Sequence, residues 1–245
     1  MRSLFFTDPL IILCTIVMGT VSLVISFFDR SGDLPHRVAR VWSRLLLRVS
    51  GLRVRVEGIE RLDRSRGCIL VANHQSLMDI PLLVAYLPIQ FRFFAKEGLF
   101  HIPFLGTHLR RTGHLPVVRD NPRAALRIVH DAARMIRERQ LSVLLFPEGG
   151  RTPDTLREFK EGAAHLAIKA GVEVIPIGVV GTRAVLPMGS VHFHPRLVEL
   201  RVGEPIPTAG LKLQDRATFT RRLEQKVAEL VGEPVPVPAD PQAFS

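Results

Sequence analysis

A histidine and an aspartate lie five positions apart in the segment VANHQSLMDI, residues 71–80, which follows the apolar run CIL. They cannot meet within one helix, because five residues rotate the chain by about 140° around the helix axis. Contact requires His74 on a loop and Asp79 in the first turn of a following helix. Pro81 is compatible with such a helix start.

That arrangement would make a general base. A helix N-terminus keeps Asp79 ionised, and an ionised carboxylate can hold the imidazole N–H of His74. The second ring nitrogen is then left to take a proton from a hydroxyl group. The alternative is an aspartate that caps the helix beside a polar turn histidine. No G-x-S-x-G elbow is present, so Ser76 is not predicted as a nucleophile, and the pair would act on a hydroxyl of the substrate.

A second polar loop, FPEGGR, follows the apolar run SVLL. Ligands of parallel sheets bind beyond the carboxyl ends of the strands. If the two apolar runs are neighbouring strands, Glu148 and Arg151 face the same crevice as His74 and Asp79. Gly149 and Gly150 permit a tight turn with the backbone close to a ligand.

Three cations lie where apolar runs meet loops: Lys96 after FRFFA, Arg119 after HLPVV and Arg151 after FPEGG. The planar fork of arginine suits a phosphate monoester, so together they predict a phosphate site. Any one of them alone would be interpreted as an ordinary surface charge.

Metal chemistry is not indicated. The chain has no C-x-x-C, H-E-x-x-H or P-loop motif. His192 and His194 alternate along a predicted strand, which suits a metal site or an ordinary polar face, and we favour the polar face. We predict no bound metal and no tightly bound cofactor.

The formal net charge is +10, from 33 Lys and Arg against 23 Asp and Glu. The excess indicates an anionic partner: nucleic acid, an acidic lipid surface or a phosphorylated substrate. Aromatic residues make up only 7% and no recognition motif appears, so we do not predict nucleic-acid binding. The only cysteines, Cys14 and Cys68, lie in apolar runs, which fits a reducing compartment.

Residues 9–28 carry no charged side chain over twenty positions. As a helix, this run would extend about 30 Å, the thickness of a bilayer's hydrocarbon layer. A cleaved signal peptide is the alternative, but the run is too long and no small-x-small pattern follows it. We predict a membrane anchor over residues 1–30 and leave open whether it crosses the bilayer or enters one leaflet.

Residues 34–51 have apolar side chains, including Trp42, on one helical face and arginines on the other. We predict a basic amphipathic helix in the headgroup layer, over residues 31–52. The alternative is a helix packed on the globular domain with a solvated basic face. Positive charge directly after the anchor places that domain on the cytoplasmic face of the cell (inner) membrane.

From residue 53 onward, β-rich runs alternate with helical patterns, and several runs are apolar on both faces. This predicts an α/β domain over residues 53–232, with a mostly parallel central sheet flanked by helices. Residues 233–245 form a Pro-rich tail that we expect to be unpacked. The predicted strands are 53–57, 67–72, 90–95, 114–118, 142–146, 173–180 and 191–202; the predicted helices are 79–87, 99–110, 122–139, 159–170 and 214–231.

The segment GLFHIPFLGTH, residues 98–108, is unusually apolar for a loop. It is expected to shape an acyl groove or to touch a membrane. The alternative is a buried helix and turn.

Four motifs in chain order, over roughly residues 67–181, resemble the glycerolipid acyltransferase family, specifically its 1-acylglycerol-3-phosphate acyltransferases. The first is N-H-x4-D, the second KEGLFHIPFLG, the third FPEGGR followed by FKEG, and the fourth VIPI. The matching residues are Asn73, His74, Asp79, Lys96, Glu97, Pro103, Gly106, Gly113, Arg119, Phe146, Pro147, Glu148, Gly149, Arg151 and Pro176.

The resemblance implies a glycerol-3-phosphate acyltransferase-like fold. It also implies acyl transfer from acyl-carrier protein or coenzyme A to the sn-2 hydroxyl of lysophosphatidic acid, which gives phosphatidic acid. His74 would be the general base and Asp79 its orienting partner. Arg119 and Arg151 would bind the acceptor phosphate, with Lys96 nearby.

The same resemblance gives roles to four more residues. Glu148 would position the glycerol part or brace its loop, and Gly149 would belong to the substrate site. Pro176 would be structural. Lys160 would be a secondary phosphate contact or a lysine on a helix surface.

This chain departs from the family pattern at Gly150, where Thr is usual, and at Gly98, where Leu is usual. Neither change removes a charged participant, but relatives act on other lysolipids. The alternatives are therefore the same chemistry on another lysolipid, or a catalytically silent relative that binds membrane lipids.

Overall fold

The computed structural model describes residues 8–29, 31–118, 121–152 and 155–236. Its centre is a seven-stranded sheet in the order β1-β7-β6-β2-β5-β3-β4. The β6–β7 pair is antiparallel and the other pairs are parallel, so the predicted mostly parallel α/β fold is confirmed. The strands are β1 Arg53–Glu57, β2 Ile69–Ala72, β3 Phe91–Lys96, β4 Leu115–Val117, β5 Ser142–Leu145, β6 Val174–Val180 and β7 Leu197–Val202.

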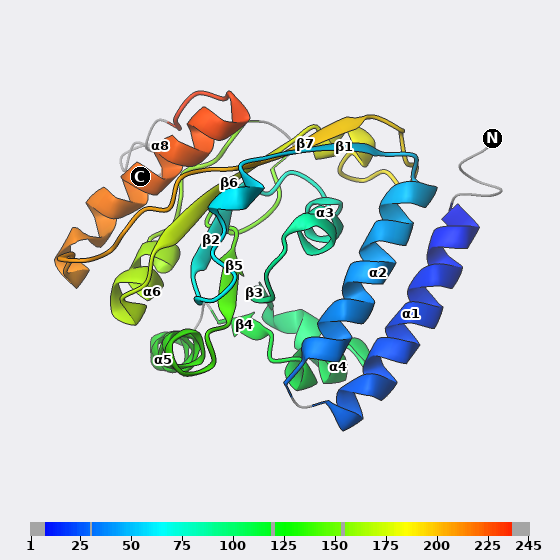
Figure 1. Cartoon of the computed structure of the whole chain (residues 1–245), viewed down its shortest axis with the longest axis horizontal. Coiled ribbons are helices and arrows are strands. Elements are labelled where there is room, and N and C mark those ends of the chain that lie inside the picture. Colours follow the sequence, from blue (N-terminus) through cyan, green and yellow to red (C-terminus); the bar gives the residue numbers. More distant parts are fainter. Residues whose placement is uncertain (1–7, 30, 119–120, 153–154, 237–245) are drawn as a thin grey trace, which may run out of the picture.

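Helices cover both faces of the sheet (Figure 1). One face carries α2 and α3, and the other carries α5, α6 and α8. The α-helices are α1 Asp8–Phe28, α2 Asp33–Val49, α3 Asp79–Tyr86, α4 Leu105–Arg111, α5 Pro122–Arg139, α6 Gly162–Ala170, α7 Thr182–Val185 and α8 Arg216–Val231. The short 3-10 helices are η2 Ile59–Arg61, η3 Glu97–His101 and η4 Leu213–Asp215.

Strand β2 shows why the central runs are apolar at every position. Leu70 and Ala72 belong to the core on the α3 side, whereas Ile69 and Val71 belong to the core on the opposite side. Successive side chains of a strand point to opposite faces, so a strand covered on both sides has no solvent-facing position. In the strand order β2 is the fourth of seven, so its carboxyl end and the polar loop that follows lie at the middle of that edge of the sheet.

The N-terminal helices α1 and α2 form a hairpin, and α2 packs against α3 (Figure 1). The Arg40 guanidinium of α2 donates to the carbonyls of Val84, Leu87 and Ile89 at the end of α3. Cations near a helix C-terminus satisfy carbonyls that lack a partner within the helix. Part of the arginine face of α2 therefore fixes this helix to the domain.

Helix α1 is long and apolar enough to cross a membrane by length and composition, with a mean hydropathy of 2.5 and 11% of that stretch buried. It is nevertheless held along its length. Trp42 Nε1 donates to Thr15 Oγ1, and the Arg111 guanidinium donates two hydrogen bonds, of 2.8 and 3.0 Å, to the carbonyl of Ser26. The Arg111 guanidinium also lies 4.0 Å from the centroid of the Phe27 ring.

The helix predicted over residues 99–110 is wrong as one element: η3 and α4 replace it, with a break at Pro103. Proline lacks the N–H that a continuous helix needs, and it disfavours the helical conformation of Ile102 before it. Phe104 then takes a positive φ of 63°, which reverses the chain into α4.

Two further predicted elements differ at their starts. The predicted strand over residues 191–202 is wrong in its first part, since β7 begins at Leu197, after Pro195. The helix predicted over residues 159–170 begins at Gly162, and the short helix α7 was not predicted.

Candidate active site

The side chains of His74 and Asp79 meet at the carboxyl end of β2. His74 Nδ1 lies 2.8 Å from Asp79 Oδ2, with His74 on the loop and Asp79 as the first residue of α3. This is the contact that the spacing predicted. A carboxylate only accepts hydrogen bonds, so Nδ1 carries the proton and Nε2 presents a lone pair.

Asp79 is fully buried, and its carboxylate accepts several hydrogen bonds. Oδ2 also accepts from the backbone N–H groups of Gln75 and Ser76, at 2.7 and 2.8 Å. Oδ1 accepts from the hydroxyl of Thr182, which opens α7 directly after β6. These donors hold the carboxylate in one orientation.

His74 is held from three other sides. Its ring stacks on Phe146, with centroids 4.1 Å apart and planes at 18°. Its backbone N–H donates to Glu148 Oε1 at 2.6 Å, and its carbonyl accepts from the N–H of Thr152 at 3.0 Å. The loops after β2 and β5 are therefore bonded to each other, as expected for neighbouring strands.

Glu148 uses both carboxylate oxygens within the protein. Oε1 accepts from His74 and Oε2 accepts from the N–H of Arg157 at 3.1 Å. Of the two predicted roles, this geometry fits the brace of the loop. Burial raises the pKa of Glu148 to about 7, against the lowering effect of these two backbone donors.

Asn73 ties the same loop to β6. Its Nδ2 donates to the carbonyl of Val179 at 2.9 Å, and its Oδ1 accepts from the N–H of Val179 at 2.7 Å. An asparagine amide can match both backbone groups of a neighbouring strand. The side chain of Asn73 therefore pairs with the backbone of β6 as a neighbouring strand would, immediately before His74.

Three of the predicted phosphate-binding cations, those within the described residues, lie around this edge. Lys96 is the last residue of β3 and is exposed, and Arg151 is half-buried in the loop after β5. Lys160 lies before α6 and not on a helix surface, and its N–H donates to the carbonyl of Pro147. Arg119 lies outside the described residues.

Gly149 has a φ of 75°, a conformation that side chains rarely adopt. A Cβ at this position would also lie 3.0 Å from Lys160 Nζ. The Lys160 ammonium therefore lies directly over the turn of FPEGGR.

The two predicted motif prolines are buried in the scaffold. Pro147 precedes Glu148, and Pro176 lies inside β6. The carbonyl of Pro176 accepts from the N–H of Gly203, one position beyond the last β6–β7 register pair. Pro176 also pairs with Val71 inside the β2–β6 ladder, and this buried place in the sheet fits the structural role predicted for it.

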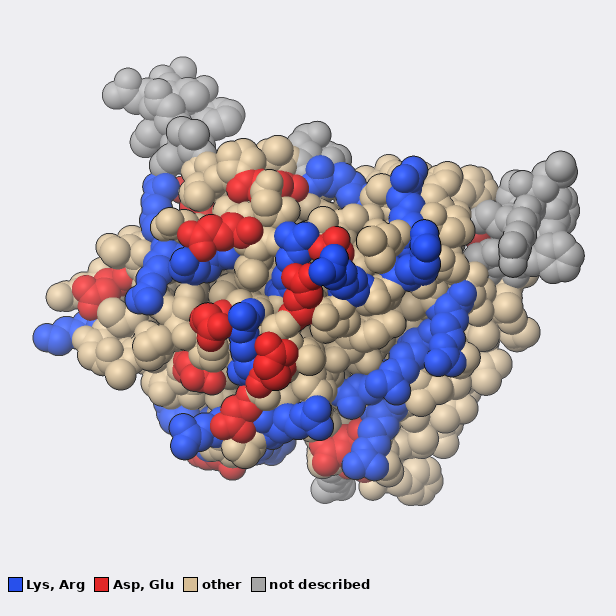
Figure 2. Space-filling model, turned by 45° about the horizontal axis from the view of Figure 1, so that its top comes forward, with Lys and Arg blue, Asp and Glu red and all other residues tan. Residues whose placement is uncertain are grey.

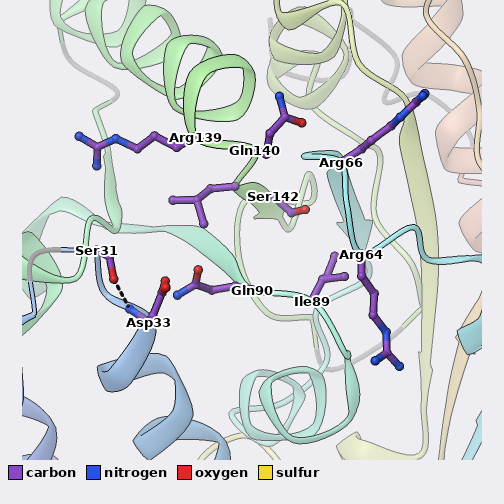
Figure 3. Close-up of a pocket in the computed structure, with 10 residues that line it drawn as sticks. Ser31, Asp33, Arg64, Arg66, Ile89, Gln90, Arg139, Gln140 and Ser142 are labelled. Carbon is purple, nitrogen blue, oxygen red and sulfur yellow. Dashed lines mark hydrogen bonds between the residues drawn. The ribbon is translucent and has the colours of Figure 1, made fainter.

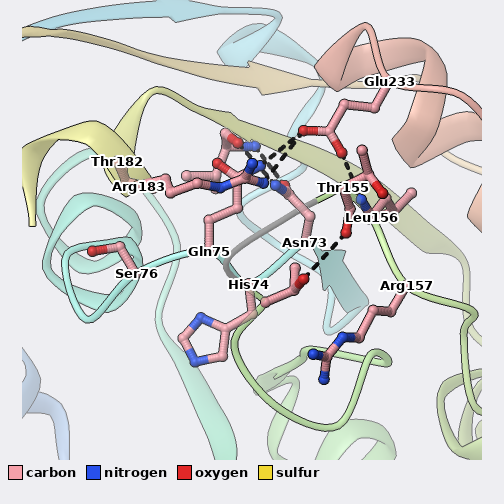
Figure 4. A network of polar contacts seen from close by, with 12 residues as sticks. Asn73, His74, Gln75, Ser76, Thr155, Leu156, Arg157, Thr182, Arg183 and Glu233 are labelled. Atoms are coloured by element: carbon pink, nitrogen blue, oxygen red, sulfur yellow. Dashed lines mark hydrogen bonds and ion pairs between the residues drawn. The ribbon is translucent and has the colours of Figure 1, made fainter. Parts of the chain in front are cut away.

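The C-terminal tail was expected to be unpacked from Glu233 onward, and this is wrong for Glu233. Its carboxylate accepts from Gln75 Nε2 at 3.2 Å and from the N–H of Leu156 at 2.6 Å, and lies 3.5 Å from Arg183 Nη2. Figure 4 shows Glu233 above the loop, with the His74 ring turned the opposite way.

Sequence reasoning missed Thr182, Arg183 and Glu233. One signal was available for the first two, because GTR follows the apolar run of β6 just as the two predicted loops follow theirs. No local pattern marks Glu233.

A cavity of about 560 Å³ lies elsewhere, at the amino ends of the strands (Figure 3). Arg64, Gln90 and Arg139 are among the residues that line it, and they precede β2, β3 and β5 respectively. No residue of the predicted site lines this cavity. Among the described residues, no group of three or more His, Cys, Asp or Glu is placed to hold a metal ion.

A buried Asp in contact with a loop His, beyond the carboxyl end of a central parallel strand, is an arrangement suited to an α/β enzyme that activates a hydroxyl group. The profile of the Acyltransferase family matches residues 53–180. The chain belongs to this acyltransferase family.

Individual relatives agree with this assignment. The chloroplastic 1-acyl-sn-glycerol-3-phosphate acyltransferase BAT2 of Brassica napus is 33% identical over 182 residues, 73% of this chain and 52% of that protein. The human 1-acyl-sn-glycerol-3-phosphate acyltransferase beta is 33% identical over 167 residues, 67% of this chain and 60% of that protein. The chain thus spans 52 to 60% of the length of these relatives.

A solved structure is similar over nearly the whole chain. The crystal structure of the 1-acyl-sn-glycerophosphate (LPA) acyltransferase PlsC from Thermotoga maritima superposes with a TM-score of 0.76 at 29% identity. The match covers 93% of this chain and 94% of that one.

Proposed function

We propose that the protein transfers an acyl group from a thioester donor to the sn-2 hydroxyl of lysophosphatidic acid, and so forms phosphatidic acid. The single observation that carries this proposal is the 2.8 Å contact between His74 Nδ1 and Asp79 Oδ2, made in a chain of the acyltransferase family. The donor is acyl-carrier protein or coenzyme A, which share the same thioester chemistry.

The mechanism uses the lone pair of His74 Nε2. This nitrogen takes the hydroxyl proton as the acceptor oxygen attacks the thioester carbonyl, and Asp79 stabilises the imidazolium that forms. Collapse of the tetrahedral intermediate forms the ester, breaks the C–S bond and expels the thiolate, which takes the proton from His74. No acyl-enzyme forms, so the catalyst returns to its starting state in one cycle.

Recognition of the acceptor phosphate is assigned to Arg151, Lys160, Lys96 and Arg119. Support comes from Lys160, whose ammonium lies beside Gly149 in the FPEGGR turn. An anion bound at this turn would therefore meet a positive charge. Glu148 then braces the turn and does not contact the glycerol.

We also propose that α1 and the segment before α4 contact the membrane. The outward side chains of α1 are large and exposed: Leu10, Ile12, Leu13, Ile16, Val17, Val21, Val24, Phe27 and Phe28. Figure 2 shows this side as a tan surface bordered by a diagonal row of Lys and Arg side chains. An apolar face with a basic border suits an anionic lipid surface.

The second contact is an apolar knuckle, formed by Leu99, Ile102, Phe104 and Leu105, all exposed. Phe104 is 76% exposed and sits at the positive-φ bend before α4, which packs against α1. Because η3 follows β3 at the same sheet edge as the catalytic loop, insertion of the knuckle would bring the site to the lipid surface.

The contacts of α1 with the globular domain favour insertion of α1 into one leaflet of the bilayer. A helix that crosses the bilayer must leave the globular domain, but α1 is bonded to α2 through Thr15 and to α4 through Ser26. The positive charge after α1 then favours the cytoplasmic face of the cell membrane.

The decisive experiment supplies the purified full-length protein with a panel of lysolipids and with labelled acyl-carrier protein and acyl-coenzyme A thioesters. Selective acylation of lysophosphatidic acid, lost in His74→Ala, is the expected result. Acylation of a different lysolipid alone would replace the acceptor and keep the chemistry. No turnover with any pair would leave a silent lipid-binding relative as the better description.

A further inference from the structure

The carboxylate of Glu233 joins three segments that are far apart in the sequence. Its partners are Gln75 in the loop after β2, Leu156 in the segment after β5, and Arg183 in α7 after β6 (Figure 4). These contacts are called the Glu233 bridge below. Glu233 comes from the first residues after α8, on neither of the predicted catalytic loops.

Each partner in the Glu233 bridge is adjacent in sequence to a residue of the site: His74, Arg157 or Thr182. Gln75 follows His74, and its own N–H donates to Asp79 Oδ2. Leu156 precedes Arg157, whose N–H donates to Glu148. Arg183 follows Thr182, whose hydroxyl donates to Asp79 Oδ1.

We propose that Glu233 is a positioning residue for acyl transfer, which fixes the relative placement of His74, Asp79 and Glu148 through the Glu233 bridge. This inference rests on the proposed function. Glu233 touches neither His74 nor the reacting groups, so it acts only through the loops that it joins.

Three features make the carboxylate suited to this task. Its two oxygens accept from different segments, Oε1 from Gln75 and Oε2 from Leu156. Its side chain is only 21% exposed, so water competes weakly for these bonds. Arg183 supplies the opposing charge, and its side chain is 31% exposed.

The test compares Glu233→Ala with Glu229→Ala in the full-length protein. Glu229 lies one helical turn earlier and is exposed, with an ion pair to Lys226 of the same helix. The readouts are kcat, KM for acceptor and donor, and hydrogen exchange in peptides that cover residues 73–79 and 155–157.

We expect Glu233→Ala to lower kcat about tenfold, with both KM values within about twofold of wild type, since misplacement costs the chemical step more than binding. Exchange in the two peptides should become faster, whereas Glu229→Ala should match wild type.

A second variant covers the case in which Glu233→Ala folds poorly. Arg183→Met removes one arm of the bridge at a partly exposed side chain and keeps both backbone loops. It should show a smaller fall in kcat, and in combination with Glu233→Gln the two effects should be non-additive. Additive effects, or unchanged kcat and exchange in Glu233→Ala, would overturn the proposal.

Failure of the proposed function would look different. A wild-type protein without acyltransferase activity would still show faster exchange at residues 73–79 in Glu233→Ala if the bridge holds that loop. Wild-type activity with unchanged exchange would instead refute the bridge alone.

Discussion

The hydroxyl of Thr182 donates a hydrogen bond to Oδ1 of Asp79 across 103 positions of sequence. Thr182 is fully buried, and its oxygen is the partner of the one Asp79 oxygen that the catalytic loop itself does not contact. Strand β6 pairs with β2, so the loop after β6 reaches the first turn of α3. The orientation of Asp79 thus depends on two neighbouring strand ends.

Replacing Thr182 by valine should therefore slow the enzyme. The change keeps the shape of the side chain but leaves Asp79 Oδ1 without its donor, at a cost of about 1.5–3 kcal/mol for a bond to a charged group. We expect kcat to fall about tenfold or more. Acyl transfer assays on the purified variant measure this directly.

Thr182→Ser should restore most of the rate, because it returns the hydroxyl. Thr220→Val is the matched control: Thr220 is also buried, at 6% exposed, but its hydroxyl donates to the carbonyl of Arg216 within α8. If Thr182→Val turns over at the wild-type rate, the hydroxyl does not position Asp79.

Removing the base should abolish turnover while the fold persists. General base catalysis contributes about 10²–10⁴-fold, so His74→Ala should lose at least that factor. Asp79→Asn should also be severely impaired, because an amide placed on His74 Nδ1 favours the wrong tautomer. Circular dichroism and vesicle binding check that structure and membrane association remain, and appreciable turnover by His74→Ala would exclude it as the base.

The contact between His74 and Asp79, and the nearness of Glu148 to them, could be predicted from the sequence because they obey a local rule. Polar loops after apolar runs become neighbours when the runs become adjacent strands, and β2 and β5 are adjacent. The five-residue spacing of His74 and Asp79 then leaves only the loop-to-helix geometry. These inferences need no knowledge of the remaining topology.

Thr182 and Glu233 depend on the topology itself. β6 joins the opposite side of β2, and α8 returns the chain so that Glu233 reaches Gln75. Neither contact has a characteristic spacing, since its partners are separated by 103 and 158 positions. The Thr182 contact follows from which strand pairs with β2, and the Glu233 contact follows from how α8 packs on the finished sheet. Neither is encoded locally in the sequence.

Glu148 should make stability depend on pH. Its pKa is raised by burial from 4.5 to about 7, so the folded protein favours the protonated form. This contribution is fully present below the unfolded pKa and is lost as the pH rises from about 4.5 to about 7, at a cost on the order of 3 kcal/mol.

The comparison of wild type with Glu148→Gln isolates this effect, because the variant does not titrate. Thermal unfolding should show the wild type losing stability relative to Glu148→Gln between about pH 4.5 and pH 7. The two proteins are compared by how their stability changes with pH and not by their absolute stability. The NH2 group of the introduced glutamine faces one of the two backbone N–H donors, which lowers the stability of the variant at every pH. Parallel pH profiles for the two proteins would contradict the raised pKa.

If Arg151 and Lys160 bind the acceptor phosphate, removing either side chain should selectively weaken binding of the acceptor. Arg151→Ala and Lys160→Ala should each raise KM for lysophosphatidic acid about tenfold, as expected for one charge-assisted contact, with little effect on the donor. Lys226→Ala, an exposed cation on α8, should leave KM unchanged. An equal rise in KM for an acceptor without phosphate would remove the phosphate assignment.

The apolar knuckle gives the last prediction. Phe104 is 76% exposed, and burying a phenylalanine side chain is worth about 1.5–3 kcal/mol. Phe104→Ser should therefore weaken binding to anionic vesicles about tenfold or more. Leu126→Ser is the control, because Leu126 is 49% exposed but lies on α5, on the face of the sheet opposite to the α1–α2 side.

Since the knuckle shares the sheet edge with His74, Phe104→Ser should also lower the rate on vesicle-borne substrate more than on detergent-dispersed substrate. Equal vesicle binding by the two variants would show that the knuckle stays in water, and that α1 alone holds the protein at the lipid surface.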